Sequence, residues 1–310
     1  MRAITMDDFG AAPALTDVPQ PTPEPGEVLV RVRASSLNGF DVAAAASLLK
    51  GMMEHRFPVV LGKDFAGTVE AVGEDASQFS IGDQVFGVVM KPFLGDGGFG
   101  EFVTVGESHG IARVPDGLDQ AAAGALGLAG TAALNAVDAV APTAGEIVLV
   151  VGATGGVGAY AIQLAVERGA VIIATAQPGA EADFVRDLGA SHTVDYTSDL
   201  AVQVRAIAPD GAHAVLHFAG DGTQLSDLLA TGGRLASTLG VGPEVLARQD
   251  ATATLVIANP DRPTLDRLAA HVASGRLRVP VTRTYALADL PEALDHFAAG
   301  TIGKLAVSID

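Results

Sequence analysis

The 310-residue sequence predicts an α/β protein in which an all-β unit is followed by a doubly wound parallel sheet. Residues 1–115 contain short β-type runs such as EVLVRVRAS and GTVEAVG, separated by turns rich in Pro and Gly. After residue 115, apolar strand-like runs alternate with helical patterns, which is typical of a parallel sheet covered on both faces. The run GATGGVG at 152–158 separates one such strand from a helix.

The positions of the individual strands and helices follow from this change in the spacing of apolar residues. Parallel strands are expected at residues 146–152, 171–175, 192–196, 213–219, 233–239 and 252–258. The helical runs AYAIQLAVERG and AEADFVRDLG both end at a glycine, as helix C-termini commonly do. The C-terminal part predicts two further helices, in RPTLDRLAAHVASG and LPEALDHFAAG, and strands at about 280–285 and in GKLAVSI. A chain of this length accommodates two domains, with a boundary near residue 115.

Charge and composition exclude several classes of function. Lys and Arg number 19 against 36 Asp and Glu, so the net charge of -17 repels nucleic-acid phosphates and anionic membranes. The absence of cysteine excludes disulfides, iron–sulfur clusters, thiolate zinc sites and cysteine nucleophiles. No window of about 18 apolar residues is free of charges, Gly or Pro, and the N-terminus lacks an apolar leader region. We therefore expect a soluble cytoplasmic protein.

The glycine run indicates a phosphate cradle. In a dinucleotide-binding fold, one glycine shapes the turn, the next admits the pyrophosphate, and the last lets helix and strand pack closely. A plain strand-to-helix turn is the alternative, but repeated strand–helix units around the run favour the cradle. The six-residue glycine motif of such folds corresponds here to residues 153–158. Its first position, usually a glycine, is Ala153, and Gly152 can take that role one place earlier. The residues expected to bind the cofactor here are Gly152, Ala153, Thr154, Gly155, Gly156, Val157 and Gly158.

Three segments carry a resemblance to a known family. They are FPVVLGKDFAGTVEAVGEDASQFSIGDQVFG at 57–87, GGFGEFVTV at 97–105, and ALGLAGTAALNAV through to the glycine run. With them the chain resembles the medium-chain dehydrogenase/reductase superfamily and, within it, the zinc-independent quinone oxidoreductases of the ζ-crystallin type. The resemblance implies a GroES-like domain at 1–115, completed by 262–310, and a Rossmann NADP-binding domain at 116–261. It also implies an active-site cleft between the domains and a homodimer formed through the Rossmann sheets.

No metal is expected in the active site. Where zinc-dependent relatives carry Gly-His-Glu, this sequence reads Gly62-Lys63-Asp64, and the cysteine ligands are absent. The 7 histidines show no metal-ligand spacing, so surface or structural roles are favoured for them. Without a Lewis acid, oxidation of an alcohol is disfavoured. A quinone or an α,β-unsaturated carbonyl accepts hydride directly from the cofactor.

The resemblance also provides candidate catalytic residues, each with a structural alternative. Asn38 either donates a hydrogen bond to the acceptor carbonyl or caps the helix over DVAAAASLLK. Asp41 is expected to orient or cap rather than to donate a proton. Lys63 either stabilises developing negative charge or is a solvated turn residue. Thr131 either lies beside the nicotinamide ring or bonds to the carbonyl four residues earlier in its helix.

The sequence favours NADPH over NADH. NAD-specific folds place an acidic residue at the end of the second strand, whereas VIIATAQPG offers Thr175, Ala176 and Gln177. Tyr196 matches a family tyrosine near the adenine ribose, with simple packing as the alternative. Further cofactor contacts are expected where later strands end, at Phe218, Ala219, Gly220, Leu239, Gly240, Ala258 and Asn259.

These observations predict an NADPH-dependent reductase that transfers hydride to a quinone. A reductase of enones, enals or enoyl thioesters is the nearest alternative, because the acceptor pocket is expected from variable loops near 45–55 and 90–98. An NADPH-binding sensor or scaffold without turnover is the alternative of another class. If the bulky stretch GMMEHRF blocked the acceptor pocket, the sensor or scaffold alternative would be favoured.

Overall fold

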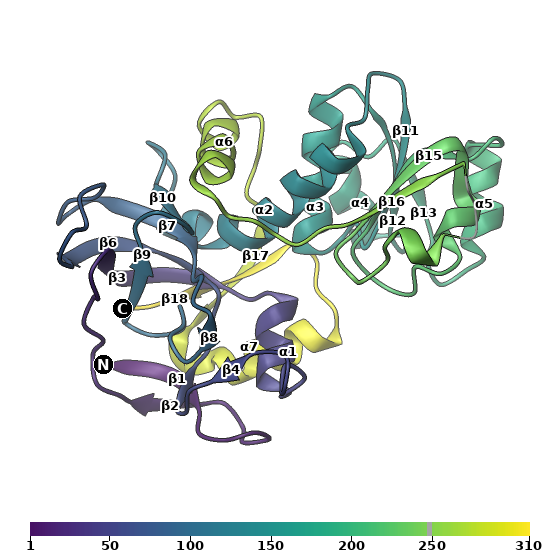
Figure 1. Cartoon of the computed structure of the whole chain (residues 1–310). Helices are drawn as coiled ribbons and strands as arrows, with labels where there is room; N and C mark the ends of the chain where they lie inside the picture. Colours follow the sequence, from purple (N-terminus) through teal and green to yellow (C-terminus); the bar gives the residue numbers. More distant parts are fainter. Residues whose placement is uncertain (247–249) are drawn as a thin grey trace. The chain divides into compact units, whose positions relative to one another are not determined.

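The computed structural model describes residues 1–246 and 250–310, which form two compact units (Figure 1). Unit 1 comprises Met1–Leu128, Pro260–Gly275 and Val279–Asp310, and unit 2 comprises Ala129–Asn259 and Arg276–Arg278. The first boundary lies later than the predicted residue 115, because the first half of α2 (Gln120–Val140) packs on strands of unit 1. A Cβ added at Gly124 would lie 2.8 Å from the carbonyl carbon of Ala34, so this contact requires glycine.

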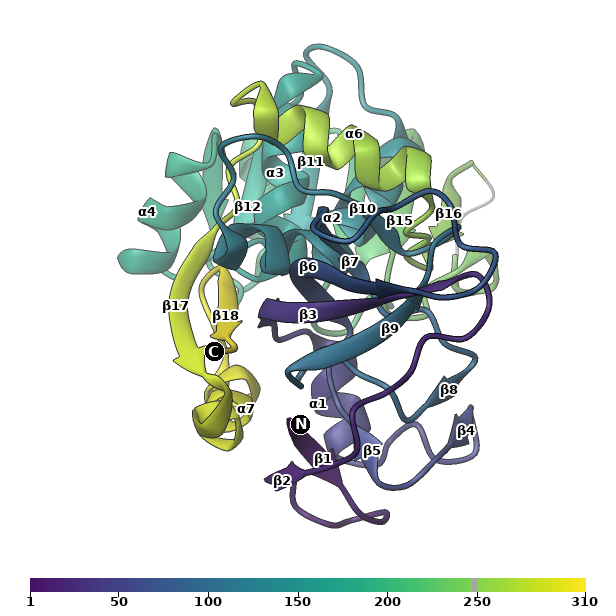
Figure 2. The same cartoon turned by 90° about the vertical axis from the view of Figure 1, so that its left-hand side faces the viewer.

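Unit 1 is built around a seven-stranded sheet. Six of its strands follow one another in a linear order, and the seventh, β9, pairs with β3 outside that order. That order is β10 (Ile111–Arg113), β7 (Gln84–Val88), β6 (Asp64–Val72), β3 (Glu27–Ser36), β18 (Lys304–Ser308) and β17 (Val281–Ala286), with β9 at Phe102–Gly106. Strand β18 pairs antiparallel with β3, with Val307 opposite Ser35. Figure 2 shows β17 and β18 side by side. The C-terminal segment therefore completes the sheet that the N-terminal segment begins.

Smaller elements surround this sheet. Strands β2 (Ala14–Asp17), β1 (Arg2–Met6) and β5 (Val59–Val60) form one sheet, and β4 (Glu54–His55) pairs with β8 (Phe93–Leu94). The helices of unit 1 include α1 (Gly39–Ala45), α6 (Arg262–Ala273) and α7 (Leu290–Ala299), with a 3-10 turn, η3, at Leu287–Asp289. Phe65, Phe99 and Val307 lie in its hydrophobic core with no exposed surface. Burial of such side chains is the main source of the unit's stability.

Unit 2 contains a six-stranded parallel sheet, which confirms the predicted fold class. The strand order is β13 (His192–Val194), β12 (Val171–Thr175), β11 (Ile147–Val151), β14 (Ala212–His217), β15 (Leu229–Ser237) and β16 (Thr252–Leu255). This is the 3-2-1-4-5-6 order of dinucleotide-binding folds. The connecting helices include α3 (Gly156–Glu167), α4 (Ala180–Asp187) and α5 (Leu200–Ile207). The 3-10 turns η1 and η2 lie at Leu225–Leu228 and Pro243–Val245.

Among the described helices, only α2 is long and apolar enough to meet the criteria for a membrane span. Its most apolar window is 78% buried within the protein, as expected for a core helix. Ala125, Leu126 and Ala133 in this helix have no exposed surface. The apolar character of α2 is thus accounted for by packing.

Candidate functional site

The glycine turn after β11 has two positions that tolerate only glycine. Gly152 has φ +81°, and its N–H donates to Thr175 Oγ1 at 3.0 Å. A Cβ at Gly158 would lie 2.3 Å from the Gly152 carbonyl oxygen and 2.6 Å from the Ala153 Cα. Gly152 therefore shapes the turn, as the sequence suggested, and Gly158 lets α3 pack tightly against the end of β11.

Gly155, by contrast, faces open space. It is the N-cap of α3, and a Cβ there would meet only the Gly152 oxygen, at 3.7 Å. The first N–H groups of a helix have no acceptor within the helix, and they lie at the positive end of its dipole. The open side of Gly155 thus leaves room for a phosphate to approach these N–H groups. The open start of α3 after this glycine turn therefore fits a dinucleotide cradle.

The other predicted contacts follow neighbouring parallel strands. The Phe218 N–H donates to the Val151 oxygen at 2.9 Å, and the Ala219 Cβ lies 2.8 Å from the place of a Cβ at Gly152. Leu239, after β15, is 50% exposed, and its N–H donates to Ser237 Oγ at 3.0 Å. Gly240 has φ +82°, and Ala258 and Asn259 follow β16. Because parallel strands end at one edge of the sheet, these residues share an edge with the glycine turn.

Thr131 lies in α2 with no exposed surface. Its Oγ1 has no hydrogen-bond partner among the described residues, so the alternative of a bond to the carbonyl four residues earlier is wrong. A buried hydroxyl without a partner is costly unless a ligand or water satisfies it. The predicted place of Thr131 beside the nicotinamide ring stays a prediction.

At the end of β12, the role of Thr175 differs from the predicted contact with the cofactor. Thr175 and Ala176 are buried, and the Thr175 hydroxyl is used inside the protein, accepting from Gly152 N–H and donating to the Val150 oxygen at 3.3 Å. Thr175 thus supports the glycine turn rather than presenting its hydroxyl to a ribose. Gln177 is exposed, and both its backbone N–H and its side-chain amide form hydrogen bonds.

The run VIIATAQPG itself carries no carboxylate, but Glu181 of the next helix, α4, forms hydrogen bonds with residues at this strand end. Glu181 Oε2 accepts the backbone N–H of Gln177 at 2.8 Å, and Glu181 Oε1 accepts the hydroxyl of Tyr196 at 3.0 Å. Gln177 Nε2 donates to the same Tyr196 oxygen at 3.1 Å. Burial and the hydrogen bond to Glu181 raise the pKa of Tyr196. The turn at Gly179, with φ +100°, separates Gln177 from the helix that carries Glu181.

In unit 1, five side chains, each less than a tenth exposed, form what we call the polar cluster: Ser36, Asn38, Asp41, Asp64 and Lys304. Asp64 lies at its centre. Its Oδ2 accepts from Ser36 Oγ at 2.6 Å and from Asn38 Nδ2 at 2.8 Å, and lies 3.6 Å from Lys304 Nζ. Its Oδ1 accepts the backbone N–H of Leu128 in α2 at 2.7 Å. Asp64 thus joins β3, β6, α2 and β18.

Lys304 and Asn38 complete this network. Lys304 Nζ donates to the Leu37 oxygen at 2.9 Å and to Asn38 Oδ1 at 2.7 Å. Asn38 Nδ2 also donates to the Ser36 oxygen, at 3.3 Å. The amide of Asn38 is therefore bonded within the cluster, and Asn38 is the N-cap of α1, as the structural alternative predicts. Its hydrogen bond to an acceptor carbonyl stays a prediction. Burial lowers the pKa of Lys304, opposed by the charges of Asp64 and Asp41.

Asp41 has the predicted capping role. It lies in the first turn of α1, and its Oδ2 accepts the backbone N–H of Asn38 at 2.9 Å. Its Oδ1 is buried and has no hydrogen-bond partner among the described residues. Burial, together with the charge of Asp64, raises the pKa of Asp41 to about 7.

We expect Asp41→Asn to alter the pH dependence of stability. From its ordinary pKa of 3.8 up to about 7, folded Asp41 keeps a proton that the unfolded chain has released. The wild type therefore loses stability as the pH rises through this window, by at most about 1.4 kcal/mol per pH unit, and the variant lacks this loss. Urea unfolding of both proteins across this pH range measures the difference. Parallel stability profiles would contradict the assignment.

Lys63 is held inside unit 1 rather than solvated. Its ammonium donates to the Val89 oxygen and lies 5.1 Å from the centre of the Phe40 ring. Burial lowers its pKa, opposed by the charges of Asp41 and Asp64. The alternative of a solvated turn residue is therefore wrong, and Lys63 provides a half-buried positive charge near the polar cluster.

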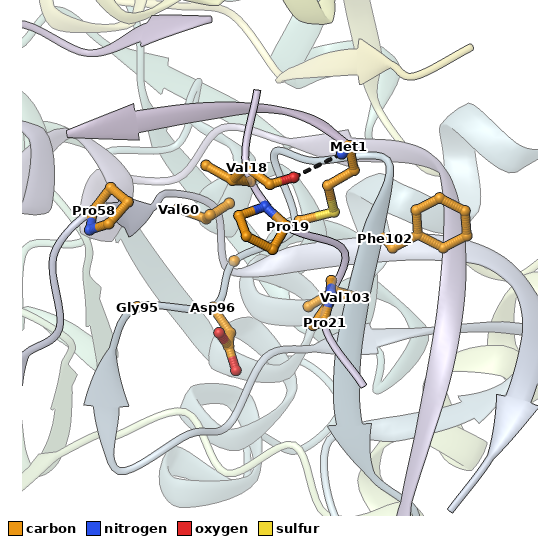
Figure 3. A pocket seen from close by; sticks show the side chains of 11 residues that line it. Met1, Val18, Pro19, Pro21, Pro58, Val60, Gly95, Asp96, Phe102 and Val103 are labelled. Atoms are coloured by element: carbon orange, nitrogen blue, oxygen red, sulfur yellow. Dashed lines mark hydrogen bonds between the residues drawn. The ribbon is translucent and has the colours of Figure 1, made fainter. Parts of the chain in front are cut away.

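The two loops predicted to shape the acceptor pocket are brought together in unit 1. Strands β4 and β8 pair in parallel, with Glu54 opposite Phe93 and His55 opposite Leu94. Met52, between α1 and β4, is 77% exposed. A cavity of about 170 Å³ has Pro19, Pro58, Val60, Gly95 and Phe102 among its lining residues, so the 90–98 loop contributes to it (Figure 3). No residue of the polar cluster lines this cavity, so it is not a candidate active site.

Within residues 1–246 and 250–310, no group of three or more His, Asp or Glu side chains is placed to hold a metal ion. His217 has the structural role predicted for histidines. One ring nitrogen lies 3.0 Å from Ser237 Oγ and the other 3.1 Å from the Gly220 oxygen.

Comparison with known proteins agrees with this geometry. The alcohol dehydrogenase GroES-like domain family matches residues 24–116, and the zinc-binding dehydrogenase family matches residues 188–307. A chloroplast envelope quinone oxidoreductase homolog from Arabidopsis thaliana is 33% identical over 231 residues, which cover 71% of this chain and 68% of that protein. The chain belongs to the medium-chain dehydrogenase/reductase superfamily. Within it, the chain is quinone oxidoreductase-like and an oxidoreductase.

Two solved structures share the whole fold. The quinone oxidoreductase from Coxiella burnetii has a TM-score of 0.90 and 28% identity, covering 100% of this chain and 99% of that chain. A mycobacterial protein in complex with NADPH has a TM-score of 0.87 and 28% identity, covering 99% of this chain and 100% of that chain. Together with the cradle in unit 2, this similarity indicates a nicotinamide dinucleotide cofactor.

Proposed function

We propose that this oxidoreductase transfers hydride from a reduced nicotinamide dinucleotide to a quinone, without zinc. The open side of Gly155, between the two sterically required glycines, is the observation that carries the proposal. It provides a cradle that a side chain would fill. The names of the relatives from Arabidopsis thaliana and Coxiella burnetii support a quinone as the acceptor.

The described residues divide the work between binding and positioning. The glycine turn and the start of α3 would hold the pyrophosphate, and the unpartnered Thr131 hydroxyl would meet the nicotinamide end. When bound, the dinucleotide supplies the hydride. Asn38 and Asp41 act as positioning residues at the start of α1, and Lys63 remains a proposed source of positive charge for the developing quinolate.

Zinc independence rests on the donor set of this chain. The sequence has no cysteine, and at the Gly62-Lys63-Asp64 segment the carboxylate of Asp64 already lies 3.6 Å from the ammonium of Lys304. A cation would have to displace this ammonium to bind Asp64. We therefore expect activity of the purified protein to persist after dialysis against a chelator.

The sequence and the structure differ on the choice between NADPH and NADH. The sequence favoured NADPH, and one structural neighbour was solved with NADPH. However, that expectation rests on residues 175–177 alone, and Glu181 of α4 accepts a hydrogen bond from the backbone N–H of Gln177. The proposed function therefore covers both dinucleotides.

The acceptor is tested by a matched panel of one quinone, one enal, one enone and one enoyl thioester, with both reduced dinucleotides and no added metal. Faster turnover of the quinone than of the other acceptors would support the proposal. Preference for an enal, enone or enoyl thioester would replace it with a reductase of activated double bonds. Dinucleotide binding without turnover of any acceptor would favour a sensor or scaffold.

We also propose that the protein is a homodimer assembled through the sheet of unit 2. Strand β16 is the edge strand of that sheet, with Leu255 47% exposed, and Ile257 just beyond it is 79% exposed. Ile257→Lys is expected to shift the protein toward monomer in sedimentation velocity. A monomeric wild type would contradict the proposal.

The cellular compartment and the binding partners of the protein are also proposals. With a net charge of -17, we propose that it acts in the cytoplasm on a small molecule, without binding nucleic acid or membranes. The name of the Arabidopsis thaliana relative places that protein at a chloroplast envelope.

A further inference from the structure

We propose that Glu181 selects the cofactor and makes NADH, rather than NADPH, the preferred dinucleotide of this chain. This inference rests on the proposed function, since it concerns the ribose end of the same cofactor site. It reverses the preference that the sequence of residues 175–177 predicted, because the deciding side chain comes from the next helix.

The carboxylate of Glu181 is fixed in place. It lies in the first turn of α4, and each of its oxygens accepts one hydrogen bond, from Gln177 N–H at 2.8 Å and from Tyr196 O–H at 3.0 Å. Gln177 is the second residue after β12, and Tyr196 is the second residue after β13. The two hydrogen bonds therefore hold the charge at the carboxyl ends of two neighbouring strands.

This position coincides with the ribose subsite of the fold. In sheets of this strand order, the second strand, here β12, ends beside the adenosine ribose of a bound dinucleotide. A carboxylate accepts hydrogen bonds from ribose hydroxyls, as the acidic residue of NAD-specific folds does. NADPH carries a phosphate in place of the 2′-hydroxyl of this ribose. The phosphate cannot donate that hydrogen bond, and it brings negative charge toward Glu181. Like charges at short range repel, so NADPH is disfavoured.

Among the described residues, no basic side chain forms an ion pair that compensates for this charge. Arg186 is the arginine nearest to Glu181 along the chain. Its Nη1 lies 3.3 Å from Asp183 Oδ1, and its Nη2 donates to Thr193 Oγ1 at 2.9 Å. Within the described part of the chain, no cation forms an ion pair with Glu181, and the charge of Asp195 also acts on Tyr196. The subsite is therefore acidic, which is the opposite of what a 2′-phosphate requires.

The test compares dissociation constants for NADH and NADPH, measured by nicotinamide fluorescence in the absence of any acceptor. For the wild type, we expect NADH to bind at least about ten-fold more tightly than NADPH. Glu181→Gln should bring the two constants together, and Glu181→Lys should reverse the order. Raising the ionic strength should weaken the discrimination of the wild type, because salt screens charges near the surface.

Asp183→Asn provides a matched control. It removes the same charge from the same helix, but the side chain of Asp183 is 77% exposed and interacts with Arg186 instead of the ribose subsite. We expect it to leave the ratio of the two constants within about two-fold of the wild type.

Tighter binding of NADPH by the wild type, or an unchanged ratio in folded Glu181→Gln, would overturn the role of Glu181 and leave the proposed function intact. Failure of the folded wild type to bind either dinucleotide would overturn the proposed function, and this inference with it.

Discussion

Gly155→Val is expected to abolish dinucleotide binding, weakening it at least about 100-fold, while the protein stays folded. A Cβ at this position meets only the Gly152 oxygen, at 3.7 Å, so the protein without ligand tolerates a side chain. The added methyl groups would occupy the space through which the pyrophosphate reaches the start of α3. Fluorescence titration with NADH and thermal unfolding of the same sample measure both properties.

Gly158→Val is the matched control, because it places the same side chain where the structure has no room. A Cβ there would lie 2.3 Å from a backbone oxygen, so this variant is expected to lose stability rather than binding alone. Normal dinucleotide affinity in folded Gly155→Val would show that the glycine turn is not the phosphate cradle.

Lys304→Met is expected to destabilise the protein by about 3–5 kcal/mol. Its ammonium lies 3.6 Å from Asp64, and both side chains are almost fully buried. Removing the ammonium leaves the Asp64 carboxylate in the core without its positive partner, and Asn38 Oδ1 loses a donor. Urea unfolding of the variant and the wild type at neutral pH measures the loss.

The double variant Asp64→Asn with Lys304→Met separates the effect of charge from that of packing. It removes both charges, so we expect it to be more stable than Lys304→Met alone. Additive losses for the two substitutions would indicate that the buried ion pair does not couple these residues. A Lys304→Met variant as stable as the wild type would contradict the role of Lys304 in the polar cluster.

Much of the fold could be predicted from the sequence because the buried strands carry a continuous signal. Val148, Leu149 and Val150 have no exposed surface, and such apolar runs between helices specify a parallel sheet. The boundary of unit 1 was less predictable. The start of α2 is a single Ala-rich helical pattern, and contacts such as that of Gly124 with Ala34 depend on the folded structure.

The candidate site was only partly predictable. The glycine turn has a local spacing that can be recognised, whereas Glu181 is separated from Gln177 by a turn and has no comparable local signal. Its one sequence signal is its distance from the glycine turn, since NAD-specific folds carry an acidic residue about 20 residues further along the chain. Lys304 contacts residues more than 260 positions away in the chain. Its only local signal is a single lysine at the start of a buried strand.

The most direct test of the central claim is the rate at which purified wild type and Gly155→Val oxidise NADH in the presence of a simple quinone. Quinones also react with reduced nicotinamides without a protein, so the folded variant provides the background rate. The proposed function predicts rapid, quinone-dependent oxidation by the wild type and only background oxidation by Gly155→Val. Equal rates for the two proteins would contradict it.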